Sequence, residues 1–142
     1  MVKVAVGSDH GGFEYKAKII DYLKEHNFEY EDVGTFTKDS CDYPIIAKKV
    51  ANKVVSGEAD KGILICGTGI GMSITANKVK GIRAALCSDT FSARATRAHN
   101  NSNILCLGER VIGDCLAIDI VDVWLHTEFE GGRHQRRIDE IE

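Results

Sequence analysis

Apolar residues along this chain fall into short runs, and each run is followed by a longer stretch with helical spacing. Lys3–Ser8 and Ile63–Ile65 are continuous runs of small and branched residues, which is typical of strands buried on both faces of a parallel sheet. Ile82–Cys87 and Asn103–Leu107 share this character, whereas Phe28–Val33 alternates and predicts a half-buried edge strand. We therefore expect five strands.

The stretches after these runs predict helices. Apolar positions at helical spacing, or cap and turn residues, mark residues 13–25, 44–57, 72 onward, 90–99, 113–125 and a short terminal helix over 133–141. The helix over 90–99 has few large apolar residues and carries Arg94 and Arg97, so we expect one face to be solvated or paired across an interface. Strands that alternate with helices predict an α/β fold with one doubly wound parallel sheet.

Composition narrows the class of protein. A chain of 142 residues is most simply one domain, over 1–142, with a tail over 131–142. A net charge of −3 gives no electrostatic reason to expect nucleic acid or an anionic membrane as the main partner. Because the chain has no signal-like start and no run approaching ~20 apolar residues, we expect a soluble cytoplasmic protein.

The cysteines suggest neither disulfides nor a zinc finger. The five are Cys41, Cys66, Cys87, Cys106 and Cys115, and no two form a C-x-x-C pair. Cys87 and Cys106 lie in or just after apolar runs, where a small buried side chain is the simpler interpretation. A metal site shared with Cys66 has no support from the spacing, so we expect reduced thiols and no metal.

A glycine-rich turn follows the central run. Cys66 ends that run and leads into Gly67-Thr68-Gly69-Ile70-Gly71. Glycines let the backbone turn with its N–H groups facing outward, and the following helix adds the positive end of its dipole. Ligands of open α/β sheets bind at the carboxyl ends of strands, so we expect this turn to hold an anion beside the thiol.

Three interpretations of the turn compete. The first is a packing turn with an inert buried cysteine. The second is a dinucleotide fingerprint, but Gly71 comes too early for G-x-G-x-x-G, and no Gly-Lys-Ser/Thr follows as in a P-loop. The third, which we favour, is a Cys66 thiolate beside an oxyanion cradle.

Other polar residues also follow strands or end helices. Asp9 and His10 come after the first strand, where Asp9 could instead cap the next helix and His10 could simply be exposed. Tyr43 enters the second helix, either as a packing residue or as a ligand contact. A histidine such as His99 at the end of a helix is favoured by the dipole alone.

Arginines four residues apart end the chain. Arg133 and Arg137 share a helical face, which suits the grip of a phosphate from one side. The alternative is a solvated tail helix with ordinary ion pairs to Asp139 and Glu140.

Taken together, these motifs resemble the type B ribose-5-phosphate isomerases nearly end to end. The ordered set that carries the resemblance is Asp9-His10-Gly11-Gly12, Asp42-Tyr43-Pro44, Gly62 to Gly71, His99-Asn100 and Gly131 to Arg137. The resemblance implies a Rossmann-like three-layer α/β/α sandwich and an aldose–ketose isomerase of carbohydrate metabolism, with no metal and no cofactor. It also implies a homodimer, or a dimer of dimers, with shared active sites.

The resemblance further implies roles for individual residues. Cys66 would be the base, the amides of Gly67 to Gly71, Ile70 included, would hold the enediolate oxygens, and Thr68 and His99 would assist ring opening. The expected substrate contacts are Asp9, His10, Tyr43, Gly67, Gly69, Ile70, Gly71, Asn100, Arg110, Arg133 and Arg137. We expect Arg110, or His99 and Asn100, to reach the ligand from a neighbouring subunit.

The expected reaction interconverts D-ribose 5-phosphate and D-ribulose 5-phosphate through an enediolate, as in the pentose phosphate pathway. An allose-6-phosphate or galactose-6-phosphate isomerase is the alternative within the same family. A non-catalytic nucleotide-binding module on the same sheet is the alternative from another class.

Overall fold

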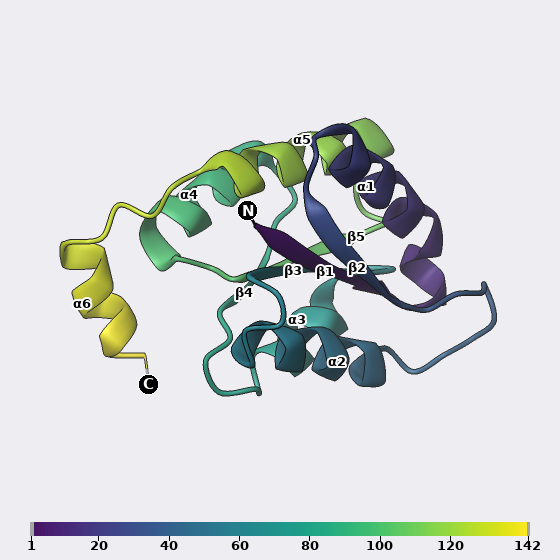
Figure 1. Ribbon diagram of the computed structural model, residues 1–142, viewed down its shortest axis with the longest axis horizontal. Coiled ribbons are helices and arrows are strands. Elements are labelled where there is room, and N and C mark those ends of the chain that lie inside the picture. The colour runs from purple at the N-terminus through teal and green to yellow at the C-terminus, as the bar shows by residue number, and fades with distance from the viewer. Residues whose placement is uncertain (1, 142) are drawn as a thin grey trace.

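Five parallel strands form the central sheet of the computed structural model, which describes residues 2–141 (Figure 1). The strands are β1 (Lys3–Ser8), β2 (Glu29–Gly34), β3 (Lys61–Cys66), β4 (Ala84–Leu86) and β5 (Ile104–Gly108). Their order in the sheet is β2-β1-β3-β5-β4. The chain moves to one side of β1 to form β2 and then crosses to the other side to form β3. The strand order therefore reverses between β1 and β3, and the crevice at such a point is the usual ligand site of an open α/β sheet.

Helices cover both faces of this sheet. They are α1 (Phe13–Glu25), α2 (Tyr43–Val55), α3 (Ile70–Ala76), α4 (Thr90–Asn100), α5 (Asp114–His126) and α6 (Arg133–Asp139), with a 3-10 turn η1 (His10–Gly12) before α1. In Figure 1, α1, α4 and α5 lie over one face and α2 and α3 under the other, while α6 stands apart beside α4. The predicted three-layer α/β/α fold with a tail helix is confirmed.

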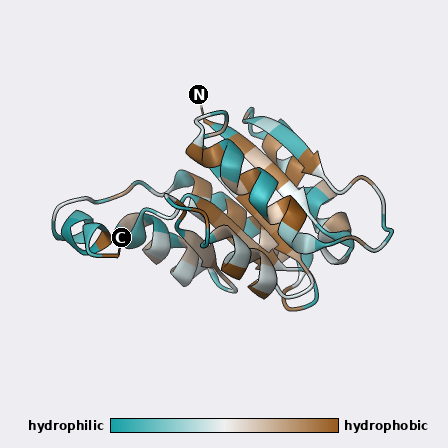
Figure 2. Ribbon diagram, turned by 90° about the horizontal axis from the view of Figure 1, so that it is seen from below, coloured by the Kyte–Doolittle hydropathy of each residue, from teal (hydrophilic) through white to brown (hydrophobic). Residues whose placement is uncertain are grey.

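Two apolar clusters, one on each face, hold the layers together. The larger packs Val6, Ile65 and Leu107 of the sheet against α1 and α5, and includes the fully buried Trp124. The smaller packs Leu64 and Ile104 against α2 and α3. Figure 2 shows the contrast between the apolar sheet and the largely polar α6. Because the sheet is filled with apolar contacts, the side chains available for chemistry lie in the loops and in the tail.

Most predicted boundaries agree with the structure to within two residues. The fourth strand is shorter than predicted, Ala84–Leu86, because it lies at the edge of the sheet and pairs with β5 alone. The helix after the glycine turn begins at Ile70 rather than Met72. No helix within residues 2–141 has the length and apolar character needed to cross a membrane.

Candidate active site

Asp9 lies where β1 ends, next to the end of β3. Its N–H donates to the carbonyl oxygen of Ile65 at 3.3 Å, and its carboxylate accepts the N–H of Gly11 at 2.8 Å. The carboxylate therefore caps η1, as the simpler interpretation expected, and the residue is only 7% exposed. A capping bond leaves a carboxylate oxygen with further lone pairs, so Asp9 can cap the turn and still accept a ligand hydroxyl.

Cys66 is the last residue of β3, and its sulfur points into the glycine turn. The N–H of Gly69 donates to Cys66 Sγ at 3.0 Å, and an N–H directed at the sulfur stabilises negative charge there. Gly69 has φ +79, and a Cβ on it would lie 2.9 Å from the carbonyl oxygen of Leu107. The conformation that places this N–H on the sulfur is therefore available to glycine and strained for other residues.

Thr68 and the start of α3 complete the turn. Thr68 Oγ1 accepts the N–H of Ile70 at 3.2 Å, so the amides of Gly69 and Ile70 already have acceptors. Gly71 lies in the first turn of α3, where N–H groups have no partner within the helix. Of the five amides expected to hold oxygens, those of Gly69 and Ile70 are thus shared with Cys66 and Thr68.

Tyr43, Arg110 and His10 surround this turn from three other segments. A Cβ on Gly71 would lie 2.4 Å from Tyr43 Cε1, so the tyrosine ring rests directly on the turn. His10 is exposed, and its Nδ1 accepts the N–H of Cys41 at 3.2 Å, which ties the loop before α2 to the end of β1. Tyr43 therefore packs the turn and, being 40% exposed, also faces solvent at the site.

Arg110 belongs to the same half of the site as Cys66. Its N–H donates to the carbonyl oxygen of Gly67 at 3.0 Å, and its Nη1 lies 3.4 Å from where a Cβ on Gly67 would be. We expected either Arg110 or the pair His99 and Asn100 to come from a neighbouring subunit. The loop after β5 is bonded to the turn of its own chain, which favours His99 and Asn100 as the residues expected from a neighbouring subunit.

His99 and Asn100 lie near the amino ends of the strands, whereas the Cys66 turn lies at their carboxyl ends. They are the last two residues of α4, and a helix that follows a parallel strand runs back toward the amino ends of the strands. Figure 1 shows the same arrangement, with the carboxyl end of β1 and the helix α6 on opposite sides of the molecule. Within one chain, then, these two side chains and the Cys66 turn form separate groups.

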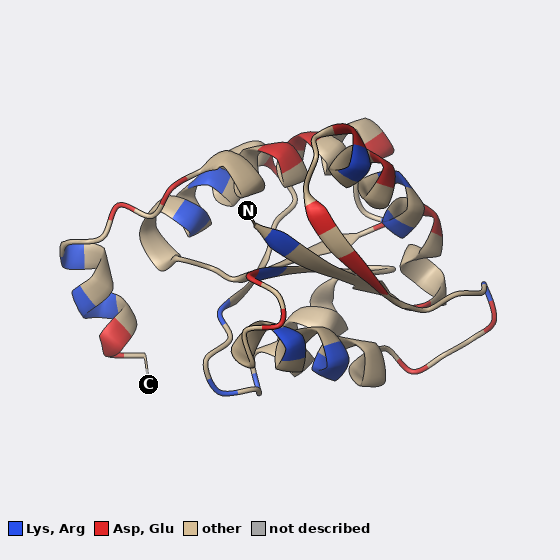
Figure 3. Ribbon diagram, in the orientation of Figure 1, with Lys and Arg blue, Asp and Glu red and all other residues tan. Residues whose placement is uncertain are grey.

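The tail helix joins the second group. Arg137 lines a shallow hollow together with His99, Asn100, His134, Ile138 and Ile141. Arg133 and Arg137 both lie on α6, whose arginines Figure 3 shows as a basic segment. We expect residues 131–142 to complete the site; within one chain the described part of this tail, α6, packs on α4, and residue 142 lies outside the described residues.

The remaining buried cysteines behave as apolar residues. Burial, with a smaller contribution from Asp89, raises the pKa of the Cys87 thiol to about 11. Burial also raises the pKa of the Cys106 thiol, which is completely enclosed. Both thiols therefore stay protonated near neutral pH, which agrees with the structural role predicted for them.

Sequence reasoning missed two neighbours of His99. The imidazole of His134 stacks on that of His99 with ring centroids 4.4 Å apart, and the carboxylate of Glu130 faces both rings. The pair Gly131-Gly132 is the signal that could have found them, because a double-glycine turn brings Glu130 and the start of α6 back onto α4.

Comparisons with known proteins agree with this geometry. The Ribose/Galactose Isomerase family profile matches residues 4–141. The chain is 51% identical over 141 residues to ribose-5-phosphate isomerase B of Escherichia coli, which covers 99% of this chain and 95% of that protein. Ribose-5-phosphate isomerase B of Clostridium thermocellum has 56% identity and a TM-score of 0.97, over 98% of this chain and 94% of that one.

A third relative has been solved with a ligand. Ribose-5-phosphate isomerase B from Mycoplasma genitalium with bound ribulose-5-phosphate has 47% identity and a TM-score of 0.94, over 98% of this chain and 93% of that one. Sequence and structure therefore agree over nearly the whole length. This chain belongs to the ribose/galactose isomerase family.

Proposed function

We propose that this protein interconverts D-ribose 5-phosphate and D-ribulose 5-phosphate. The observation that carries the proposal is the Cys66 sulfur, held by an N–H of a glycine turn at the point where the strand order reverses. The names of the relatives support the choice of reaction, including the one with bound ribulose-5-phosphate.

The chemistry needs a base and an oxyanion site together. The carbon-bound hydrogen beside a sugar carbonyl is a weak acid, so its removal requires a positioned base and donors for the developing enediolate. In the proposed mechanism the Cys66 thiolate takes the proton from the second carbon of the open aldose and returns it to the first. The amides of the turn stabilise the enediolate, and each such donor typically contributes about 3–4 kcal/mol to lowering the barrier.

Asp9 and the arginines have binding roles in this proposal. The Asp9 carboxylate accepts sugar hydroxyls, and His10, Tyr43 and Arg110 line the same opening. Arg133 and Arg137 bind the phosphate, because guanidinium groups form charge-assisted and often bidentate bonds to it.

A site with both groups of residues requires two copies of the chain. We propose a homodimer, as the basic unit of any larger assembly, in which His99, Asn100, Arg133 and Arg137 of one subunit meet the Cys66 turn of the other. The support is that, within one chain, these four residues lie near the amino ends of the strands and the Cys66 turn lies at their carboxyl ends. Two-fold symmetry would then create two equivalent sites per dimer.

His99 is the proposed acid–base group for ring opening, assisted by Thr68. The variant His99→Asn should therefore slow the isomerisation of cyclic sugar more than that of the open-chain fraction. A pre-steady-state trace should show a burst from the open-chain pool followed by a slow phase. Equal slowing of both phases would remove His99 from ring opening.

A substrate competition tests the proposed reaction itself. Ribose 5-phosphate should be isomerised in preference to allose 6-phosphate and galactose 6-phosphate when all are offered to one preparation. Preference for a six-carbon substrate would move the protein to the other branch of its family. Nucleotide binding in a calorimeter without any sugar-phosphate turnover would contradict the proposal and favour a binding module.

A further inference from the structure

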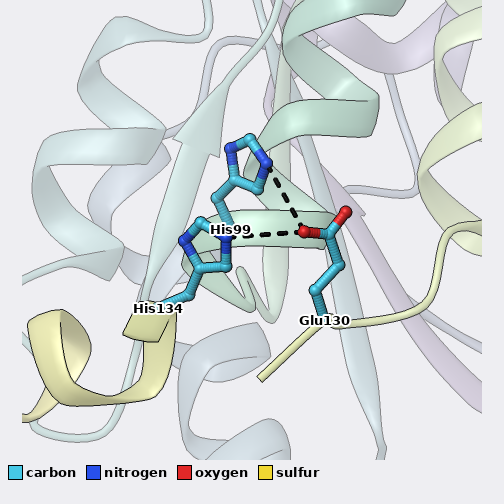
Figure 4. A group of neighbouring side chains, drawn as sticks. All are labelled: His99, Glu130 and His134. Atoms are coloured by element: carbon cyan, nitrogen blue, oxygen red, sulfur yellow. Dashed lines mark ion pairs between the residues drawn. The ribbon is translucent and has the colours of Figure 1, made fainter. Parts of the chain in front are cut away.

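We propose that His99, Glu130 and His134 form a binding site for a divalent transition cation of the zinc type. Each offers one ligand atom, and the three atoms lie within 4.8 Å of one another. This is the one group of its kind among residues 2–141. Figure 4 shows the two imidazole rings side by side with the Glu130 carboxylate turned toward both.

The spacing of the three atoms suits a shared ion better than direct hydrogen bonds. Glu130 Oε1 lies 3.4 Å from His134 Nε2 and 3.9 Å from His99 Nε2. Two donor atoms on one tetrahedral zinc ion lie about 3.3 Å apart, because the bonds to nitrogen and oxygen are about 2.0–2.2 Å long. Binding of one ion requires the stacked rings to turn their nitrogens toward it and the longer separation to close, and the side chains of His99 and Glu130, 49% and 60% exposed, have room to rotate.

The backbone holds the group together across three segments. The N–H of Glu130 donates to the carbonyl oxygen of Ala98 at 3.0 Å, which fixes the chain beside the last turn of α4. Gly131 and Gly132 then have φ +69 and +57, a left-handed turn that suits glycine. The turn directs α6 back onto α4, where the His134 side chain is only 11% exposed.

The ligand set selects the class of ion. Two imidazoles and one carboxylate are a donor set of catalytic zinc sites, with a fourth position left for water or another ligand. Imidazole nitrogen favours Zn²⁺, Ni²⁺, Co²⁺ and Cu²⁺ over Mg²⁺ and Ca²⁺, which prefer oxygen donors.

The surrounding charges act in both directions. The carbonyl groups at the end of α4 favour a cation, and so does the Glu130 carboxylate. Arg137 lines the same hollow and opposes a cation. We therefore expect a reversible site rather than a permanently filled one.

Occupation of this site would have a consequence that rests on the proposed function. An ion bound to His99 Nε2 removes the nitrogen that ring opening needs, so zinc would inhibit the isomerase. Sugar phosphate and zinc would then compete for the same imidazole.

Cobalt binding tests the site without reference to activity. Titration of the full chain with Co²⁺ should give visible absorption bands for one ion per chain, with no sulfur-to-cobalt charge-transfer band and no response to Mg²⁺. Removal of a direct ligand should cost at least the ~10–100-fold typical of an outer-shell partner. Glu130→Gln and His134→Gln should therefore each weaken Co²⁺ binding tenfold or more.

His126→Asn is the matched control. His126 lies 3.3 Å from Asp122 on α5, and this pair supplies two ligand atoms instead of three. The Co²⁺ affinity of this variant should equal that of the wild type. Unchanged binding in both Glu130→Gln and His134→Gln, a thiolate-type spectrum, or no binding by the wild type would each overturn the proposal.

Inhibition by Zn²⁺ separates this proposal from the proposed function. The wild type should lose activity over the range in which it binds zinc, and Glu130→Gln, active without zinc, should need at least tenfold more. If cobalt binds as expected but zinc leaves isomerisation unchanged, the metal site is supported and the role of His99 in turnover is contradicted.

Discussion

The Cys66 turn and the α4–α6 region hold their functional side chains by different means. In the turn, Cys66 is 6% exposed, and backbone bonds to Gly67 and Cys66 from the loop after β5 fix the position of Arg110. In the α4–α6 region, His99 and Glu130 are about half or more exposed, and α6 packs on α4 with His134 stacked on His99.

This difference indicates which part of the site is preformed. The proposed base and oxyanion donors would need fixed geometry, and the backbone around Cys66 is held in place within one chain. Arg133 and Arg137, the proposed phosphate contacts, lie on a short helix in which Ile138 is the buried residue. Assembly of two subunits would bring the second group to the first, and each prediction below tests one side of this contrast.

The largest expected effect is that of Cys66→Ala. The substitution removes the proposed base and one sulfur acceptor from the turn, so turnover should fall by at least about 10²–10⁴-fold while the chain stays folded. Exchange of the hydrogen at the second carbon with solvent, followed by NMR, measures the loss directly. Cys106→Ala is the control, because it removes a thiol from the neighbouring core and should change packing more than catalysis. Near wild-type exchange by Cys66→Ala would exclude the thiolate mechanism.

A smaller effect is expected for Arg137→Ala on the tail. Loss of a hydrogen bond to a charged group costs about 1.5–3 kcal/mol, or roughly 10- to 150-fold in affinity. The loss should appear in KM for the sugar phosphate and little in kcat. Arg136→Ala is the control, since adjacent residues of a helix face different directions, and equal losses in both variants would indicate a general charge effect rather than a phosphate contact.

The smallest effect concerns the stability of the turn. Gly69→Ala should cost about 1–2 kcal/mol, because alanine is strained at positive φ and the Leu107 backbone leaves it no room. Gly71→Ala meets the Tyr43 ring instead, so the double variant with Tyr43→Ala should recover part of the loss. Urea denaturation midpoints measure both, and recovery of Gly69→Ala by the same Tyr43→Ala change would contradict this assignment of the two clashes.

Hydrophobic patterning predicted the strands and helices because a parallel sheet buried on both faces imposes continuous apolar runs. It did not predict the burial of Arg97, which we expected on a solvated or interfacial face. Arg97 is 7% exposed, lies over the Trp124 ring and donates to the carbonyl oxygen of Ser102 at 2.6 Å. Residue type alone cannot reveal such a partner, because Ser102 and Trp124 reach Arg97 only in the folded chain.

The candidate site divides in the same way. Cys66 and the glycines were predictable because a strand, a turn and a helix are consecutive in sequence. The separation of His99 from Cys66 was not predictable, since it depends on which end of the strands each residue lies at. The contacts of Glu130 and His134 with His99 depend on a turn whose direction only the backbone conformation of Gly131 and Gly132 sets.

Hybrid dimers test most directly whether one active site contains residues of two subunits. Inactive Cys66→Ala chains mixed with slow His99→Asn chains should gain about a quarter of wild-type activity on the cyclic sugar above that of the His99→Asn chains alone, because half of the randomly formed dimers are hybrids and each hybrid has one intact site. Cys66→Ala mixed with Arg110→Ala should regain none, since both groups lie on the same side. Cys66→Ala and His99→Asn hybrids that show no gain over the His99→Asn parent, although verified by mass spectrometry and built from folded dimeric parents, would contradict the shared site.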